Sequence, residues 1–292
     1  MSRTDKIGIG AYPTNGTQRM ITDLARLGVA WFYTWRPHAS AAVPGARRPR
    51  RSLRSPPDCL RPSAGAPQAV APRPERGGQG DGACFVAMVW GEKTARKLAR
   101  DVRANRRAPL LTFNEPDDKR QANMSVARAI ALWPRLMKLG RPLASPAVTT
   151  RGTLGPGSWL GRFMTEVDER GYRVDFVAVH YYADSADVVR FRQFLERVHR
   201  DYRRPIWVTE WALADWRQPG RFSPAQQAAF AREAAAMLDE LDFVERHAWF
   251  GIYPGMDGWT IGSAAVAGGR LTEIGHSLLG LSGKHLDEPR RR

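Results

Sequence analysis

Short apolar or β-branched runs alternate along this sequence with longer runs of helical period, and this alternation constrains the fold more than any other feature. Runs of that length predict buried strands, and apolar residues every three or four positions predict helices packed against them. Eight strands are expected, at residues 7–11, 29–34, 85–90, 110–114, 142–146, 176–180, 206–210 and 246–250. Eight β-α units predict an α/β chain folded as a single (β/α)8 TIM barrel.

An open doubly wound sheet is the alternative to the barrel. Such a sheet would place a Gly-x-Gly-x-x-Gly turn after its first strand. The residues that follow the first strand here are Ala11-Tyr12-Pro13-Thr14-Asn15-Gly16, so that turn is missing. The barrel is therefore favoured.

Three of the expected helices carry clear local signals. Ser223, Pro224 and Gln226 form the pattern of an N-cap, a proline at the first helical position and a capping-box glutamine. Ser125 is expected to cap a second helix. A third helix is predicted from apolar residues at steps of three and four, namely Val188, Phe191, Leu195, Val198 and Tyr202.

Residues 38–82 depart from this organisation. The segment holds eight Pro, six Gly, eight Ala and eight Arg, with no aromatic residue and no helical period. Such a composition cannot bury enough apolar surface to offset the entropy of ordering, so an irregular or disordered insertion between strands two and three is expected. A genuine low-complexity insertion and an out-of-frame coding stretch both remain open. The domain prediction is one catalytic barrel over residues 1–292 with this insertion at 38–82.

The net charge of +16 at first suggests a nucleic-acid or membrane partner. About half of the excess lies in 38–82, where eight Arg face three acids, and in Arg290–Arg292. No aromatic residue interleaves with the basic segment, as a base-stacking surface would require. No stretch of about 18 apolar residues is present. We therefore expect a monomer with neither a nucleic-acid nor a membrane partner.

Cys59 and Cys84 are the two cysteines of the chain. They form no Cys-x-x-Cys pair, and one of them lies inside the irregular segment. A disulfide between them is possible on this pattern, but two free thiols are favoured.

Two strands end in a glutamate. Leu110–Phe113 is followed by Asn114, Glu115 and Pro116, and Ile206–Thr209 is followed by Glu210. The carboxyl ends of barrel strands meet at one rim, where catalytic side chains project. Strict alternation would place Leu111 and Phe113 on the face of Glu115, and Ile206 and Val208 on the face of Glu210. The alternative, that each glutamate only ends a strand, is weakened by their occurrence as a pair.

A pair of carboxylates suits the cleavage of a glycosidic bond. One carboxylic acid protonates the leaving oxygen, and the other group acts at the anomeric carbon. Retaining enzymes hold the two groups about 5 Å apart, and inverting enzymes hold them roughly 6.5–9.5 Å apart. The spacing at the rim therefore decides between the two mechanisms.

The order of Asn-Glu after strand four and Glu after strand seven resembles the clan A glycoside hydrolases. Further blocks are similar to glycoside hydrolase family 128 in the right order, and only 38–82 breaks the likeness, because the family connects strands two and three by a shorter segment. These blocks are Trp31–Trp35, Phe85–Gly91, Phe113–Asp117, Gln121–Ser125, Val174–Tyr182, Pro205–Trp211 and Ala248–Phe250.

The resemblance implies a retaining β-1,3-glucanase, expected to be endo-acting on a β-glucan polysaccharide or oligosaccharide. Glu115 would be the acid/base and Glu210 the nucleophile. Asn114 would hold the sugar 2-hydroxyl, and Tyr181 or Tyr182 would donate to the nucleophile or border it. An extracellular location is also implied, although no signal peptide is expected, because Met1–Lys6 leads directly into the first strand.

Further residues at the strand ends are candidates for the substrate site. His180 could bond the nucleophile or a sugar hydroxyl, or be a rim histidine satisfied by backbone. Trp249 is expected to form an aromatic floor under the sugar, and Trp35, Trp90 and Trp211 could also stack on sugar rings. Trp133 and Trp207 are expected in the core between helices and strands. The six His show no metal-ligand spacing, so no metal and no cofactor are expected.

Three alternatives to an endo-β-1,3-glucanase stay open. Another clan A activity, such as a mannanase or an exo-glucosidase, would use the same carboxylates on another sugar. A catalytically impaired glycan-binding barrel would bind glucan without cutting it. A basic nucleic-acid scaffold would bind DNA in a salt-dependent manner.

Overall fold

The computed structural model describes residues 5–14, 16–37, 83–97, 108–256 and 260–283. The strands are β1 (Ile7–Gly10), β2 (Trp31–Tyr33), β3 (Cys84–Phe85), β4 (Ala87–Val89), β5 (Leu110–Asn114), β6 (Leu143–Ala147), β7 (Val177–Ala183), β8 (Ile206–Leu213), β9 (Val244–Phe250), β10 (Val266–Ala267) and β11 (Arg270–Leu271). The helices are α1 (Thr17–Leu27), α2 (Glu92–Lys97), α3 (Val126–Met137), α4 (Trp159–Glu169), α5 (Val188–Tyr202), α6 (Pro224–Glu240) and α7 (Glu273–Leu281), with a short 3-10 helix at Thr150–Gly152.

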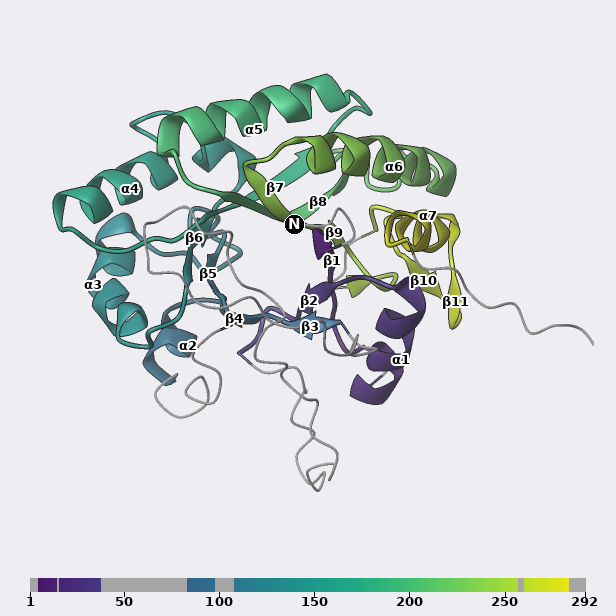
Figure 1. Ribbon diagram of the computed structural model, residues 1–292, viewed down its shortest axis with the longest axis horizontal. Helices are drawn as coiled ribbons and strands as arrows, with labels where there is room; N and C mark the ends of the chain where they lie inside the picture. The colour runs from purple at the N-terminus through teal and green to yellow at the C-terminus, as the bar shows by residue number, and fades with distance from the viewer. Residues whose placement is uncertain (1–4, 15, 38–82, 98–107, 257–259, 284–292) are drawn as a thin grey trace, which may run out of the picture.

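The strands lie inside a surrounding layer of helices (Figure 1). Strands β3-β2-β1-β9-β8-β7 form one sheet and β4-β5-β6 form another, and all pairings within both are parallel. Parallel bridges Ala144–Phe176 and Val148–Val179 connect β6 with the β7 region. The eight expected strands are present, with the third divided into β3 and β4. The result is an α/β fold of mostly parallel strands, consistent with a TIM-barrel-like arrangement.

The predicted helix starts are confirmed. The Ser125 side chain accepts from the backbone N–H of Arg128 at the start of α3. Ser223 and Gln226 exchange both hydrogen bonds of a capping box at the start of α6. These bonds satisfy N–H groups that a helix end otherwise leaves without partners.

The core has two parts. The larger part lies between strands and helices and includes Trp133, as expected. The smaller part lies on the opposite, inner side of the strands, where Trp207 stacks on Phe176 with ring centroids 4.4 Å apart and meets Trp31 at 5.2 Å. The expectation that Trp207 faces the helices is therefore wrong. Gly8 makes room for this packing, because a Cβ there would lie 2.4 Å from the Trp31 ring.

Strict alternation along β5 and β8 was also a wrong prediction. Leu111 lies in the interior cluster and Phe113 in the outer one, while Ile206 and Val208 both face outward. Both strands contain register shifts in their pairings with neighbours. The shift between Thr112 and Asn114 adds a residue to β5, and the shift between Val208 and Trp211 adds one to β8, so the alternation of faces is broken at both places.

Three further expectations concern the chain as a whole. Cys84 is disulfide-bonded, so the prediction of two free thiols is wrong; Cys59 lies outside the described residues. The segment 38–82, with its predicted disorder, also lies outside them. Within the described part of the chain, no helix combines the length and apolar character needed to cross a membrane.

Candidate active site

Glu115 stands at the carboxyl end of β5 in a left-handed backbone conformation, with φ of 40°. Its N–H donates to the Ala147 carbonyl at 2.7 Å, whereas the preceding Asn114 N–H donates to the Trp90 carbonyl at 2.9 Å. Successive residues therefore bond to strands on opposite sides, β6 and β4. Glu115 as a whole residue is only 7% exposed.

Glu210 lies within β8 and is almost fully buried. Its Oε1 accepts from Trp35 Nε1 at 2.8 Å and from the Tyr33 hydroxyl at 3.2 Å. Its Oε2 accepts from the Tyr182 hydroxyl at 2.6 Å. Donors from β2 and β7 thus hold both oxygens, and this fixes the orientation of the carboxylate.

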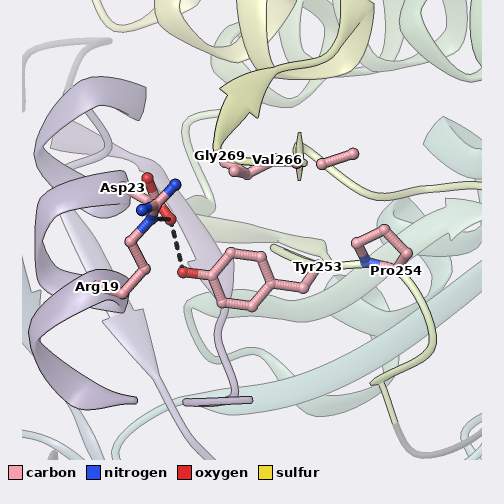
Figure 2. A pocket seen from close by; sticks show the side chains of 8 residues that line it. Arg19, Asp23, Tyr253, Pro254, Val266 and Gly269 are labelled. Carbon is pink, nitrogen blue, oxygen red and sulfur yellow. Dashed lines mark hydrogen bonds and ion pairs between the residues drawn. The ribbon is translucent and has the colours of Figure 1, made fainter. Parts of the chain in front are cut away.

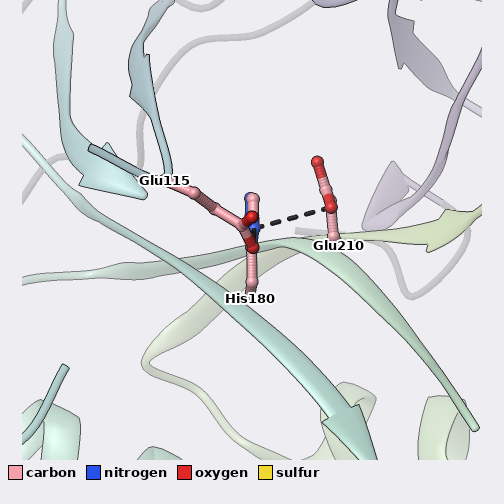
Figure 3. A group of neighbouring side chains, drawn as sticks. All are labelled: Glu115, His180 and Glu210. Atoms are coloured by element: carbon pink, nitrogen blue, oxygen red, sulfur yellow. Dashed lines mark hydrogen bonds and ion pairs between the residues drawn. The ribbon is translucent and has the colours of Figure 1, made fainter. Parts of the chain in front are cut away.

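His180 of β7 connects the two glutamates (Figure 3). Its Nδ1 lies 2.9 Å from Glu115 Oε1 and 3.5 Å from Glu210 Oε2. Burial by itself lowers the pKa of His180, but the charges of Glu210 and Glu115 outweigh burial and raise that pKa above its ordinary value. His180 therefore bonds Glu115 and also faces Glu210. The sequence suggested a contact only with Glu210, the predicted nucleophile.

Burial has the largest effect on the pKa of Glu210. It raises the pKa of this carboxyl, and the charge of Glu115 raises it further, while His180, Tyr182 and Trp35 act in the opposite direction. The pKa values of the Tyr33 and Tyr182 hydroxyls are raised well above 10, first by burial and then by the charge of Glu210. Both tyrosines therefore remain donors through the neutral range.

The same three groups define where a metal could bind. Among the described residues, Glu115, His180 and Glu210 offer ligand atoms that all lie within 4.8 Å of one another. They come from three different strands, which is why no local spacing in the sequence marks them. Both Glu210 oxygens already accept hydrogen bonds from neutral donors, an arrangement suited to a carboxylate that reacts directly. The expectation that the enzyme needs no metal stays a prediction.

Of the other predicted residues, three contact the glutamates, while Asn114 and Trp90 are joined by a backbone hydrogen bond next to Glu115. His180, Tyr182 and Trp35 contact the glutamates directly. Asn114 is buried beside Glu115; its Nδ2 donates to Gln121 Oε1 at 3.3 Å, and its Oδ1 has no partner among the described residues. Trp90 is half-buried after β4 and packs against the interior cluster.

Three other candidates lie elsewhere: of the alternatives Tyr181 and Tyr182, it is Tyr182 that reaches Glu210, and the stacking roles predicted for Trp211 and Trp249 are wrong. Tyr181 faces α5, where its ring stacks on Phe191 at 4.0 Å. Trp211 and Trp249 are fully buried in the outer core and meet edge to face at 4.8 Å. Alternation explains each case, because Tyr182, Glu210 and Phe250 are the neighbours that point inward.

Three aromatic residues of the site were not predicted. Tyr33 contacts Glu210, and Phe250 meets Trp35 edge-on at 5.6 Å and Tyr182 at 5.7 Å. Trp216, in the loop after β8, meets Tyr182 edge-on at 5.1 Å and is 52% exposed. Alternation from Trp35 could have indicated Tyr33, whereas no local signal separates Phe250 from Trp249, and Trp216 lies in a loop without periodic signal.

Comparison with known proteins agrees with this geometry. A family model described as a glycosyl hydrolase catalytic core matches residues 10–277. The alkali-sensitive linkage protein 1 of Schizosaccharomyces pombe is 28% identical over 150 residues, which make up 49% of this chain. The match spans only 27% of that protein's length.

Solved structures give a match along most of the chain. A glutamate variant of a GH128 subgroup I endo-β-1,3-glucanase from Amycolatopsis mediterranei, in complex with laminarihexaose, is 33% identical, with a TM-score of 0.73 over 94% of this chain and 99% of that one. Another glutamate variant of that enzyme, with laminaritriose and laminaribiose, is also 33% identical, with a TM-score of 0.74 over 95% and 99%. The curdlan-specific GH128 subgroup III exo-β-1,3-glucanase of Blastomyces gilchristii, at 24% identity and a TM-score of 0.61 over 94% and 97%, shares the fold. The chain therefore belongs to glycoside hydrolase family 128 and is a glycoside hydrolase.

Proposed function

We propose that this enzyme cleaves β-1,3-glucan internally and with retention, with Glu115 as acid/base and Glu210 as nucleophile. The carrying observation is the separation of the two carboxylates, whose nearest facing oxygens lie within 4.8 Å of each other. A retaining mechanism needs about 5–5.5 Å, and an inverting one needs space for a water at about 6.5 Å or more.

The residues around the two glutamates fit these roles. Glu115 protonates the glycosidic oxygen while Glu210 attacks the anomeric carbon, so the C–O bond breaks and a glycosyl ester forms. Glu115 then takes a proton from water, which displaces Glu210. Asn114 Oδ1, a buried acceptor with no partner among the described residues, is available to the sugar 2-hydroxyl.

Two observations support β-1,3-glucan as the substrate: the ligands of the solved relatives and the exposed ring of Trp216. The endo-β-1,3-glucanase relatives at 33% identity hold laminari-oligosaccharides. Trp216 offers an exposed ring beside Tyr182, where it can cover the apolar face of a glucose unit. Oligosaccharides of several lengths released from linear β-1,3-glucan would support endo action, whereas release of glucose alone, or cleavage of mannan or cellulose instead, would contradict this assignment.

Substitution of the two carboxylates tests the mechanism. Glu115→Gln and Glu210→Gln should each lower kcat on linear β-1,3-glucan by at least a thousandfold, on the order of 4 kcal/mol in the barrier. The matched control is Glu166→Gln, which removes a surface carboxylate that pairs with Arg170. Azide should restore turnover of Glu210→Ala and give an α-glycosyl azide. Full activity in either active-site Gln variant would disprove its assigned role.

Three whole-protein properties belong to the same proposal. We infer that the strands close into a complete (β/α)8 barrel, that one chain forms the active unit, and that the enzyme works outside the cell, where its polymeric substrate lies. Light scattering at assay concentration and fractionation of the producing cells test the last two. A dimer, or activity confined to the cytosol, would contradict them.

A further inference from the structure

Tyr33 has a single hydroxyl hydrogen and two acceptors within reach. Its oxygen lies 2.8 Å from the Thr209 carbonyl and 3.2 Å from Glu210 Oε1. A neutral phenol can donate only one strong hydrogen bond. The two acceptors belong to adjacent residues of β8, beside the register shift between Val208 and Trp211.

The ring of Tyr33 is held in place by its surroundings. It is fully buried, stacks on Trp31 with centroids 6.2 Å apart, and meets Trp35 edge-on at 4.9 Å. Close packing of this kind prevents displacement of the ring. The ring stays in place, so only rotation of the hydroxyl group decides whether its hydrogen points to the Thr209 carbonyl or to Glu210.

The charge on Glu210 changes during the proposed reaction. As a carboxylate it attracts a donor strongly, and as a glycosyl ester it is a weak acceptor. A hydroxyl bound only to Glu210 would then lose its partner, and a buried hydroxyl without a hydrogen bond is unfavourable. The Thr209 carbonyl offers the replacement.

We propose that Tyr33 is a positioning residue whose hydroxyl donates to Glu210 while that group is a carboxylate and turns to the Thr209 carbonyl while it carries the sugar. This inference rests on the proposed role of Glu210 as nucleophile. Its consequence lies in the second step of the reaction. There, water attacks the anomeric carbon and gives its proton to Glu115, and the bond to the Glu210 oxygen breaks with its electron pair returning to the carboxylate. Tyr33 stabilises the carboxylate as it forms.

Other groups act on Glu210 at the same time. His180 and Tyr182 face it from β7, Glu115 faces it from the end of β5, and Trp35 donates from the β2 side. The test must therefore separate the contribution of Tyr33 from theirs. Tyr33→Phe keeps the ring and removes only the hydroxyl. Tyr202→Phe is a matched control, since its hydroxyl donates to the Thr153 carbonyl and does not contact Glu210.

The first measurement needs no substrate. The carboxyl carbons of 13C-labelled glutamate are followed by NMR against pH, and the Glu210 signal is identified by its loss in Glu210→Gln. Tyr33→Phe should move the Glu210 midpoint about 1 pH unit higher, as expected for loss of a donor to a charged group. An unchanged midpoint in a folded Tyr33→Phe protein would overturn the proposal. The control should titrate like the unsubstituted enzyme.

The second measurement follows the covalent intermediate. With an activated aryl β-1,3-gluco-oligosaccharide, Tyr33→Phe should show a burst of released phenol, with kcat and KM both lower by about tenfold. A general packing defect would lower kcat/KM without a burst, and that result would overturn the role in the second step. Full activity of Glu210→Gln would instead refute the proposed function, while the NMR titration would still judge the Tyr33 contact.

Discussion

At the scale of single residues, the central feature is a buried carboxylate surrounded by neutral donors. Burial raises the pKa of Glu210, whereas His180, Tyr182 and Trp35 lower it, and the proposed role as nucleophile needs the ionised form. Tyr182 makes the shortest of its hydrogen bonds, at 2.6 Å. The acid limb of the pH–rate profile should therefore depend on this tyrosine.

We expect Tyr182→Phe to move the acid limb of kcat/KM to higher pH. The lost hydrogen bond favours the ionised form, so its removal raises the pKa of Glu210 and lowers the ionised fraction in mild acid. The midpoint of the acid limb should move up by about 1 pH unit, as expected for the loss of one hydrogen bond to a charged group. The measurement is kcat/KM from pH 4 to 9, with Tyr202→Phe as control. If the limb stays in place, it does not report the ionisation of Glu210.

At the scale of elements, β1 contributes to the site because its residue Gly10 has no side chain. Gly10 lies beside Tyr33 in the pairing of β1 with β2. A Cβ at Gly10 would lie 2.8 Å from the Trp35 ring and 3.2 Å from the Tyr33 hydroxyl oxygen. A bare backbone on β1 thus allows two donors to reach Glu210.

Gly10→Ala should therefore damage catalysis through Trp35. The added methyl group displaces the indole that donates to Glu210, so kcat should fall by at least tenfold, and unfolding should become easier by about 1–3 kcal/mol through overpacking. Gly157→Ala is the control, because nothing lies within 4 Å of a Cβ there. Steady-state kinetics and urea denaturation provide both quantities. Wild-type kinetics in Gly10→Ala would show that Trp35 does not need this space.

The sequence predicted the elements better than the faces of their residues. Eight strands, three helices (two of them with their N-caps) and the two glutamates follow from periodicity, capping and strand ends, which are local properties. The inward direction of Glu210 does not follow from local properties. Trp207, three positions earlier, also points inward, and strict alternation would place residues three positions apart on opposite faces. The register shift responsible arises from pairing with β9, which lies more than thirty residues away in the chain.

The same limit explains the misplaced aromatic residues. Trp249 was predicted under the sugar because it ends a strand, yet its indole donates to the Ser263 carbonyl at 2.7 Å in the outer core. Phe250, one residue later, faces the site. A shift of one residue along a strand exchanges the two faces, and single-sequence periodicity does not fix strand ends that closely.

At the scale of the whole molecule, the N-terminal and C-terminal parts meet along one seam. β1 pairs with β9 over four residues, and α1 lies beside the hairpin of β10 and β11. A pocket of about 370 Å³ lies there (Figure 2). At its wall the buried Asp23 accepts from the Tyr253 hydroxyl at 2.8 Å and pairs with Arg19 and Arg26.

This contact should stabilise the whole fold without taking part in catalysis. Tyr253 follows β9 and Asp23 belongs to α1, so their hydrogen bond joins residues 230 positions apart. Tyr253→Phe leaves the Asp23 carboxylate without its buried neutral donor, and the free energy of unfolding should fall by about 1–2 kcal/mol. Tyr172→Phe, on the α3–α4 side of the molecule, should change it by less than about 0.5 kcal/mol. Urea denaturation measures both, and the pH profile of kcat/KM should match the unsubstituted enzyme. Equal stability of the two variants, or an altered pH profile of Tyr253→Phe, would contradict this purely stabilising role.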